Sequence, residues 1–391
     1  MTPAARLQAA IEILDEVIAS ARHEGLPADV IVTRYFKKRR YAGSKDRRAV
    51  RELVFRAIRR SAEMPESGRA AALGLAQEEP GLLGLFGEVR GPDALLEGEQ
   101  GAEPAIVPGW SEAELSRLVC TDEQPALLER APLDLRVNIA RASREEMLPQ
   151  FNGATLTALS PWGIRLPPDS RVDDHPAFEA GLVEIQDEGS QLIALACAPR
   201  NRERILDLCA GAGGKALALA AAAPHAIILA SDTNRERLAK LGPRAARAGA
   251  AIETRLLNQP RELDELADWR VAADLVLVDA PCSGSGTWRR NPEGRWRLTP
   301  ERLSRLVSVQ QRLLEIAAEL VKPGGRLVYA VCSLLSREGA GQIDRFLQDR
   351  SSWISEDTPI SAGRADGAGR LLTPGHDRTD GFFVARLRRS C

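Results

Sequence analysis

The apolar residues of the first part of the chain recur at helical spacing. Residues 4–22 and 46–61 each carry an apolar stripe with a period close to 3.6 residues. Residues 66–130 stay compatible with helix between interruptions rich in Gly, Pro and Glu, and no alternating strand pattern precedes Leu133. This part of the sequence predicts an all-helical domain over residues 1–130.

The pattern changes after Pro132. The stretch "LDLRVN" alternates between apolar and polar residues, and Ser143 and Glu146 form a capping box that opens a short helix. Two further stretches, "GATLTAL" and "WGIRL", have the composition of short strands. We therefore expect a small α/β module, similar to an RNA-recognition motif, over residues 131–176.

A longer alternation of strands and helices occupies residues 177–391. Apolar strands are predicted at 204–208, 226–231, 252–257, 274–279, 326–331 and 381–387, with helices between them at 214–223, 234–248, 261–267 and 300–322. Strands separated by helices indicate a mostly parallel, doubly wound Rossmann-like sheet. Ligands bind such sheets at the carboxyl ends of the strands. The predicted fold class is α/β, with the catalytic domain in this last part.

The amino-acid composition indicates which class of protein this is and argues against others. Of 391 residues, 44% are hydrophobic and 27% charged, as in an ordinary globular protein. No apolar run reaches the length of a membrane span, and acidic residues stand where a signal peptide would be apolar. Six cysteines show no CxxC pairing, which argues against a metal site and a disulfide framework. We expect a cytoplasmic, monomeric protein without metal or membrane partner.

Positive charge is concentrated in two places, although the net charge is only −1. Residues 34–60 hold twelve Lys and Arg against two acidic residues. Such a run is commonly a solvated face, but the interleaved Tyr35, Phe36 and Tyr41 favour a surface for nucleic acid. A second basic cluster, made of Arg289, Arg290, Arg295 and Arg297, follows Cys282. The candidate RNA-binding residues are Arg39, Arg40, Lys45, Arg47, Arg48, Arg289 and Arg290.

A glycine-rich turn follows the first strand of the predicted sheet. In "ILDLCAGAGGKALALA", Gly211, Gly213 and Gly214 allow a ligand to approach the N-terminus of a helix. The next strand ends in Asp232, placed to bind the two hydroxyls of a ribose, and the third ends at Asn258, near an adenine. NAD and S-adenosylmethionine both satisfy this pattern.

Two cysteines follow strands of the same sheet and decide between these cofactors. Cys282 lies in "DAPCSGSGTWRRNP" and Cys332 in "YAVCS". Hydride transfer has no evident use for two such thiols. Methyl transfer to carbon 5 of cytosine does, because a thiolate that adds at carbon 6 makes carbon 5 nucleophilic.

These motifs together resemble those of the S-adenosylmethionine-dependent RNA cytosine-5 methyltransferases of the Sun/NOP2 group. The resemblance extends over residues 131–391 and rests on "EIQDEGSQL", "DLCAGAGGK", "DAPCSGSGTWRRNP" and "YAVCS" in this order. The N-terminal part, with "RRYAGSKDRRAVRELVFRAIRR", is similar to the NusB-like helical domain of the 16S ribosomal RNA methyltransferase B subgroup.

The resemblance implies a role for each motif residue. Cys332 is the expected nucleophile, Cys282 assists product release, and Asp279 contacts the target base or the cofactor. Binding of S-adenosylmethionine is expected from Cys209, Ala210, Gly211, Ala212, Gly213, Gly214, Lys215, Asp232, Asn258 and Asp279. Four positions depart from the family pattern. Ala212 stands where a proline is frequent, and Ala216 stands where a threonine is frequent. Asn258 stands where an acid is common, and Val331 replaces the usual threonine before the nucleophile.

Other functions share parts of the pattern. Transfer RNA competes with ribosomal RNA as substrate, because helical basic domains serve either. A non-catalytic ribosomal RNA assembly factor needs no pair of thiols, and a small-molecule methyltransferase needs no basic run at residues 34–60. A DNA cytosine-5 methyltransferase attacks with the cysteine of its proline-cysteine motif, here Cys282, and does not need Cys332.

Overall fold

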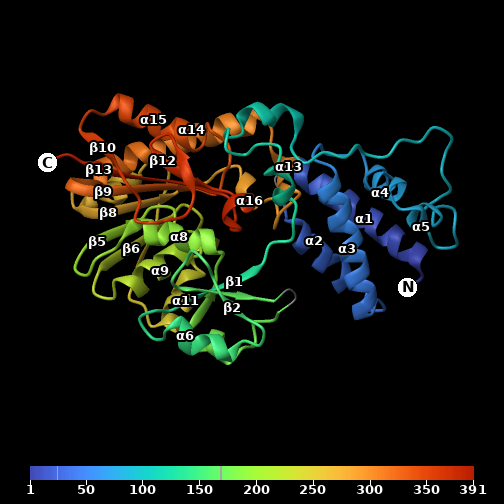
Figure 1. The fold of residues 1–391 in the computed structure, drawn as a ribbon, viewed down its shortest axis with the longest axis horizontal. Helices are drawn as coiled ribbons and strands as arrows, with labels where there is room; N and C mark the ends of the chain where they lie inside the picture. Colours follow the sequence, from blue (N-terminus) through green and yellow to red (C-terminus); the bar gives the residue numbers. More distant parts are fainter. Residues whose placement is uncertain (24, 168–169) are drawn as a thin grey trace. The chain divides into compact units, whose positions relative to one another are not determined.

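The computed structural model describes residues 1–23, 25–167 and 170–391 (Figure 1). They form two compact units, each made of segments that are separated in the sequence. The first unit comprises residues 1–114, 124–129 and 287–302; the second comprises residues 115–123, 130–286 and 303–391. Among the described residues, no helix has both the length and the apolar character needed to cross a membrane.

The first unit is helical, as the sequence predicts. Its helices are α1 (Pro3–Arg22), α2 (Ala28–Lys37), α3 (Ser44–Arg60), α4 (Gly68–Gln77), α5 (Pro80–Leu83), α13 (Gly294–Arg297) and the 3-10 helices η1 (Gly109–Glu114) and η2 (Gln124–Leu127). The interruption expected at residues 91–105 is longer than predicted, because residues 84–108 contain only turns, bends and irregular segments. Frequent Gly and Pro in this stretch disfavour helix.

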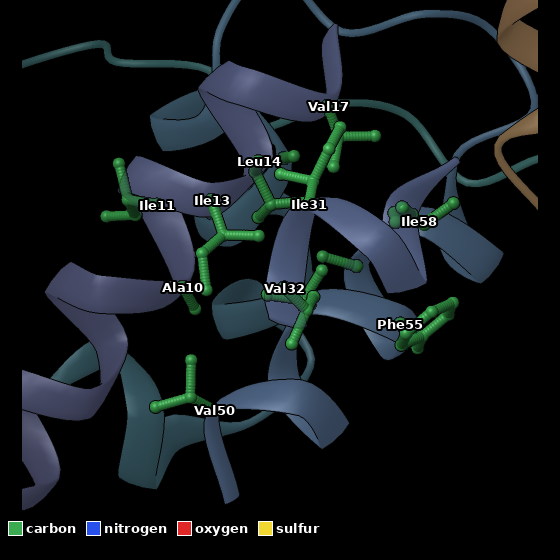
Figure 2. Packing of buried hydrophobic residues seen from close by; sticks show 14 of the residues in the cluster. Ala10, Ile11, Ile13, Leu14, Val17, Ile31, Val32, Val50, Phe55 and Ile58 are labelled. Carbon is green, nitrogen blue, oxygen red and sulfur yellow. The ribbon is translucent and has the colours of Figure 1, made fainter. Parts of the chain in front are cut away.

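A single apolar core holds α1, α2 and α3 together. Figure 2 shows Leu14 and Val17 of α1 close to Ile31 of α2, with Val50 and Ile58 of α3 in the same cluster. All five side chains are fully buried. Each contributes about 1.5–3 kcal/mol through burial of its apolar surface, so the 3.6-residue stripes of the sequence do form the interface between these helices.

Of the three aromatic residues that favoured a nucleic-acid surface, Tyr35 and Phe36 belong to this core. Tyr35 and Phe36 are each 4% exposed, and the Tyr35 hydroxyl donates a hydrogen bond to Glu12 at 2.7 Å. Tyr41 is 74% exposed. The expectation that all three lie on a nucleic-acid surface is therefore wrong for Tyr35 and Phe36, which face inward because α2 buries one side against α1.

The segment 287–302 completes the helical unit. Arg295 is 1% exposed, and its guanidinium donates five hydrogen bonds to backbone carbonyls, those of Ile58, Arg59, Ala105, Ile106 and Pro292. Two of these carbonyls, those of Ile58 and Arg59, belong to the last turn of α3. Carbonyls in the last turn of a helix have no N–H group of a following turn to accept from, so Arg295 supplies their donors. The Glu293 side chain accepts from Ala28 N at the start of α2, and Trp296 joins the apolar core.

The second unit begins with a small antiparallel sheet. Its strands are β1 (Leu133–Val137), β2 (Thr155–Leu156), β3 (Gly163–Leu166) and β4 (Val183–Ile185), in the order β2-β3-β1-β4. The short helices α6 (Arg144–Met147), η3 (Leu148–Gln150) and α7 (Pro176–Glu179) accompany it. The capping box of Ser143 and Glu146 is present. Because β4 pairs with β1, this module continues past residue 176.

The large sheet has nine strands. Its path runs β11-β12-β13-β9-β8-β5-β6-β7, and β10 pairs with β13. The strands are β5 (Arg204–Asp207), β6 (Ile227–Asp232), β7 (Glu253–Leu256), β8 (Ala273–Asp279), β9 (Val321–Val331), β10 (Trp353–Glu356), β11 (Arg364–Asp366), β12 (Gly369–Leu372) and β13 (Phe382–Arg389). All six predicted strands are confirmed, and β5 to β9 pair in parallel, as a doubly wound sheet requires.

Helices cover both faces of this sheet (Figure 1). In Figure 1, α14 and α15 lie on one side and α8 and α9 on the other, where they share an apolar core with the strands. The helices of this part are α8 (Glu188–Cys197), α9 (Gly214–Ala222), α10 (Arg235–Leu238), α11 (Leu241–Ala248), α12 (Glu262–Glu265), η4 (Ala267–Trp269), η5 (Ser285–Thr287), α14 (Pro300–Leu320), α15 (Ala340–Asp349) and α16 (Pro374–Asp377). The helix expected over 234–248 is broken before α11, since Pro243 has no N–H to continue the ladder from α10.

We expect replacement of Arg295 by methionine to destabilise the helical unit. Methionine fills a similar volume but leaves the carbonyls at the end of α3 buried without donors, at a cost of about 3 kcal/mol or more. The measurement is the free energy of unfolding by urea of the full chain. Arg40→Met, at an exposed position, is the matched control. Equal stability of the two variants would contradict this structural role.

Candidate active site

The carboxyl ends of five parallel strands lie at one edge of the large sheet. Strand β5 lies between β6 and β8, so the chain reverses its direction across the sheet at β5 and β8. This switch in strand order is where doubly wound sheets bind their ligands. The residues at or just after these strand ends are Asp207, Asp232, Asn258, Asp279, Cys282 and Cys332.

The glycine turn after β5 has the backbone shape that the sequence predicts. Gly211 and Gly213 have positive φ angles of 55° and 82°. A Cβ at Gly213 would lie 2.1 Å from Leu241, so this position tolerates no side chain. At Gly214, the first residue of α9, the nearest atom to a Cβ would be Gln186 Nε2 at 3.9 Å. The turn therefore presents an open face beside the first N–H groups of a helix, which attract anions.

Asp232, the last residue of the neighbouring strand β6, is hydrogen-bonded to this turn. Its carboxylate accepts hydrogen bonds from Gly211 N and Asn234 N, each at 2.7 Å. One acceptor site of each oxygen is used by these bonds, and each oxygen retains another. Asn258 is exposed, and both its backbone N and its Nδ2 donate to Glu265, at 2.7 and 2.9 Å. This pairing orients the Asn258 amide so that its nitrogen faces Glu265.

A cation and an acid meet between β5 and β8. Lys215 Nζ lies 2.6 Å from Asp279 Oδ2, and the Lys215 side chain is only 10% exposed. Burial lowers the pKa of Lys215, but the Asp279 carboxylate outweighs burial and raises this pKa above its ordinary value. The same cation is electrostatically coupled to Cys332. Lys215 thus carries a positive charge beside one of the two cysteines.

The two cysteines are in direct contact. Cys282 Sγ lies 3.3 Å from Cys332 Sγ, although fifty residues separate them. The hydrogen bond to Cys332, burial, and the negative charges of Cys332 and Glu338 raise the pKa of Cys282 well above its usual value. Cys282 is therefore protonated at neutral pH, and either sulfur can donate the hydrogen bond between them.

The remaining cysteines lack such an arrangement. Burial, together with the charges of Asp207, Asp232 and Asp279, raises the pKa of Cys209 well above its usual value, which disfavours the reactive thiolate. Burial raises the pKa of Cys197 in the same way. Cys120 and Cys391 are exposed free thiols. Only Cys282 and Cys332 form a thiol pair within the part of the chain that the structure describes.

Two buried acids at this edge were not among the residues predicted from the motifs. Glu338, six residues after Cys332, is fully buried and accepts hydrogen bonds from both cysteine loops. Asp207 is fully buried at the end of β5, and neither carboxylate oxygen meets a donor with normal hydrogen-bond geometry. The sequence gives little sign of either acid. Each is a single acidic residue beside a motif whose function is already explained by its other residues.

The candidate RNA-binding residues of the helical unit differ in exposure. Arg40, Lys45, Arg47 and Arg48 are exposed at the end of α2 and the start of α3. Arg39 is partly covered, stacks over the Tyr35 ring and pairs with Glu12 at 3.1 Å. Arg290 is partly exposed, whereas Arg289 is 5% exposed. The exposed cations therefore gather around the turn between α2 and α3.

Within residues 1–23, 25–167 and 170–391, there is no set of three or more His, Cys, Asp or Glu side chains that could hold a metal ion.

Asp207 predicts a pH-dependent change in stability. Burial, with repulsion from Asp279 as the second cause, raises the pKa of Asp207 to about 7. The folded state therefore binds a proton that the unfolded chain releases at lower pH, and stability falls as pH rises from about 4 to about 7. We expect the stabilisation by Asp207→Asn to grow by about 3 kcal/mol between pH 5 and pH 8.

Urea unfolding of both proteins at the two pH values measures this difference. Asp264→Asn, at an exposed position, serves as the control. A stabilisation that shrinks with rising pH would contradict the assignment of a buried, neutral Asp207.

Comparison with known proteins agrees with this geometry. Residues 194–388 match the family model described as 16S rRNA methyltransferase RsmB/F. A curated relative from Synechocystis sp., named probable ribosomal RNA small subunit methyltransferase B, is 36% identical over 296 residues. The aligned region covers 72% of this chain but only 64% of that relative.

Solved structures share the fold. The crystal structure of PH0851 has a TM-score of 0.75 at 22% identity, with 100% of this chain and 99% of that chain covered. A methyltransferase homolog protein from Pyrococcus horikoshii has a TM-score of 0.61 at 26% identity, over 71% of this chain and 92% of that one. The doubly wound sheet is thus the Rossmann-like sheet of methyltransferases. Through residues 194–388, the chain belongs to the RsmB/F family of 16S rRNA methyltransferases.

Proposed function

We propose that this protein is an RNA (cytosine-5) methyltransferase that methylates carbon 5 of a cytosine in 16S ribosomal RNA, with S-adenosylmethionine as methyl donor. The observation that carries the proposal is the 3.3 Å contact between Cys282 Sγ and Cys332 Sγ at the ends of neighbouring strands. Methylation of an unactivated aromatic carbon needs a nucleophile and a second group that releases the product. Two thiols beside the Lys215–Asp279 ion pair supply both.

The cofactor-binding residues fit S-adenosylmethionine. The open face at Gly214 and the first-turn N–H groups of α9 suit the carboxylate of its methionine part. Asp232 keeps free acceptor sites for the ribose hydroxyls. Asn258, with its amide nitrogen held by Glu265, offers its oxygen to an amino group such as that of adenine. When bound, the cofactor supplies an electrophilic methyl group on a sulfonium.

Cys332 is the proposed nucleophile. Its thiolate adds to carbon 6 of the cytosine, a Cys332–C6 bond forms, and the electrons of the C5–C6 double bond become available at carbon 5. The cation of Lys215, held by Asp279, interacts electrostatically with Cys332. The target cytosine must leave its stack to reach this site, as other bases do in enzymes that modify them.

Cys282 and Asp279 take the other roles. Once carbon 5 is methylated, removal of its proton restores the double bond and expels the Cys332 thiolate. Cys282 lies against Cys332 and is the group placed to assist this release. Asp279, fixed by Lys215 at 2.6 Å, is proposed to hydrogen-bond the N3–N4 edge of the base. A carboxylate suits this edge, because the exocyclic amine of cytosine is a donor.

The turn between α2 and α3 is the proposed RNA-binding surface of the helical unit. Arg40, Lys45, Arg47 and Arg48 surround it and are exposed, as phosphate contacts require. Tyr41 is 74% exposed within the same turn. A tyrosine ring with this exposure can stack on an unpaired base, which is the usual partner of sequence-specific RNA proteins.

We expect the serine variants of the two cysteines to behave in opposite ways. Cys282→Ser should accumulate a covalent protein–RNA adduct, because attack by Cys332 proceeds and release is blocked. Cys332→Ser should form none. Incubation with 16S RNA and S-adenosylmethionine, followed by denaturing electrophoresis, measures the adduct.

Cys120→Ser, which alters an exposed thiol, should behave as the wild type. An adduct with Cys332→Ser but not with Cys282→Ser would transfer the nucleophile to Cys282, as in DNA cytosine-5 methyltransferases. Bisulfite sequencing of RNA from cells that lack the gene tests the substrate. Loss of 5-methylcytosine from transfer RNA, with 16S RNA unchanged, would contradict the ribosomal half of the proposal.

The turn between α2 and α3 predicts a salt-dependent loss of RNA affinity. The double variant Arg40→Ala, Arg48→Ala should reduce the slope of log K against log salt by about 1.5 to 2, since each cation releases about one counterion. Tyr41→Ala should cost about 1–3 kcal/mol, with recovery in Tyr41→Phe. Filter binding at several salt concentrations gives both quantities.

Arg22→Ala is the matched control for this surface. Arg22 is an exposed cation at the end of α1. Glu12, the partner of Arg39, stands ten residues earlier in α1. Arg22 therefore lies about 15 Å along the helix from Glu12. An effect of Arg22→Ala as large as that of the double variant would show that net charge, and not this turn, determines the affinity.

A further inference from the structure

A buried carboxylate connects the loops of the two cysteines. Glu338 is fully buried and lies between β9 and α15. Its carboxylate accepts four hydrogen bonds, from Ser283 N at 2.8 Å, Gln310 Nε2 at 2.9 Å, Ser333 Oγ at 2.5 Å and the Ser283 hydroxyl. Among the described residues, Glu338 forms no ion pair. Every acceptor contact of this carboxylate is therefore with a loop that carries a cysteine, or with Gln310.

On the Cys282 side, both neighbouring peptide groups are fixed. Gln310 Nε2 donates to Pro281 O at 3.0 Å, directly before Cys282, and Ser283 N donates to Glu338 directly after it. Gln310 is itself fully buried and accepts from Gln342 at 3.1 Å. Because the loop "PCSGSG" contains two glycines, these bonds supply the rigidity that the loop composition does not.

On the Cys332 side, the same carboxylate holds the next residue. Ser333 Oγ donates to Glu338, and Ser333 is 1% exposed. Gly286 N donates to Cys332 O at 3.0 Å, and Leu334 N donates to Ser285 Oγ at 2.8 Å. These bonds join the two loops to each other as well as to Glu338. The spacing of the sulfur atoms thus follows from one shared network.

Burial of a carboxylate without a cation costs free energy, and the hydrogen bonds from both cysteine loops offset this cost. An apolar residue of the same volume would leave the four groups that donate to this carboxylate without an acceptor. Its negative charge also contributes to the raised pKa of Cys282. The charged and titratable groups near the pair are Lys215, Asp279, Asp207, Tyr329 and Glu338, and of these the Glu338 side chain alone is hydrogen-bonded to both cysteine loops.

We propose that Glu338 is a positioning residue that sets the distance between Cys282 and Cys332. This inference rests on the proposed function for its catalytic meaning, but the spacing itself can be measured without methyl transfer. Glu338 touches neither cysteine sulfur by a hydrogen bond, so it acts through Ser283, Ser333 and Gln310.

The experiment uses disulfide formation as a measure of the spacing. With oxidised glutathione as oxidant, the two thiols lose two protons and two electrons, and one oxidised glutathione becomes two reduced molecules. The rate of the Cys282–Cys332 disulfide is followed by mass spectrometry after alkylation, in a full-length background with Cys120→Ser and Cys391→Ser. Glu338→Ala should lower this rate at least about tenfold, because misplacement by about 1 Å is enough for such losses.

Glu338→Gln provides the conservative rescue. Its amide oxygen can accept from Ser283 N and Gln310, and the serine hydroxyls can turn to accept from its nitrogen. This variant should form the disulfide no more slowly than the wild type. In methyl-transfer assays, Glu338→Ala should lower kcat at least about tenfold without change in KM for S-adenosylmethionine, and Glu338→Gln should recover most of it.

Glu262→Ala is the matched control, because Glu262 is 3% exposed and its side chain accepts a hydrogen bond from Arg312. It should leave the disulfide rate unchanged. If Glu338→Ala fails to fold, Ser333→Ala removes a single donor and should slow the disulfide about threefold. Wild-type disulfide rates in folded Glu338→Ala, or in Ser333→Ala, would overturn the positioning role. Slow disulfide formation in Glu338→Ala, together with a wild-type protein that has no methyltransferase activity on RNA, would overturn only the proposed function.

Discussion

The chemistry of this protein depends on the parallel pairing of β8 and β9. Their register places Asp279 opposite Ala330, one residue before the end of β9. Parallel neighbours end at the same edge of a sheet, so the loops that follow them leave side by side. Cys282 and Cys332 meet at 3.3 Å for this reason, even though fifty residues separate them. A shift of one residue in this register would turn each side chain of β9 to the opposite face.

Around this pair, charge is distributed unevenly. Lys215 faces Asp279 and interacts electrostatically with Cys332, whereas the charge of Glu338 helps to raise the pKa of Cys282. The two sulfur atoms are therefore in different electrostatic surroundings, although they are in contact. This difference suits the two cysteines to different steps of the proposed reaction.

Much of the catalytic unit could be predicted from the sequence, because its strands alternate with helices and its motifs follow the strands. Parallel topology then brings Asp232, Asp279 and both cysteines to one edge without further information. The contribution of residues 287–302 to the helical unit could not be predicted, since the contacts of Arg295 with the end of α3 are long-range. Arg295 also shows that a basic cluster in the sequence can contain a buried structural residue. The role of Glu338 depends on hydrogen bonds from three separate segments, which no local pattern records.

The division of the helical unit between distant segments has a consequence for synthesis on the ribosome. Chains emerge from the N-terminus, and domains generally fold as they become complete. Here α1, α2 and α3 emerge early, but Glu293, Arg295 and Trp296, which cap and pack them, are added only after strands β5 to β8 of the large sheet have been made. The final packing of the helical unit therefore waits for the catalytic strands β5 to β8 to leave the ribosome.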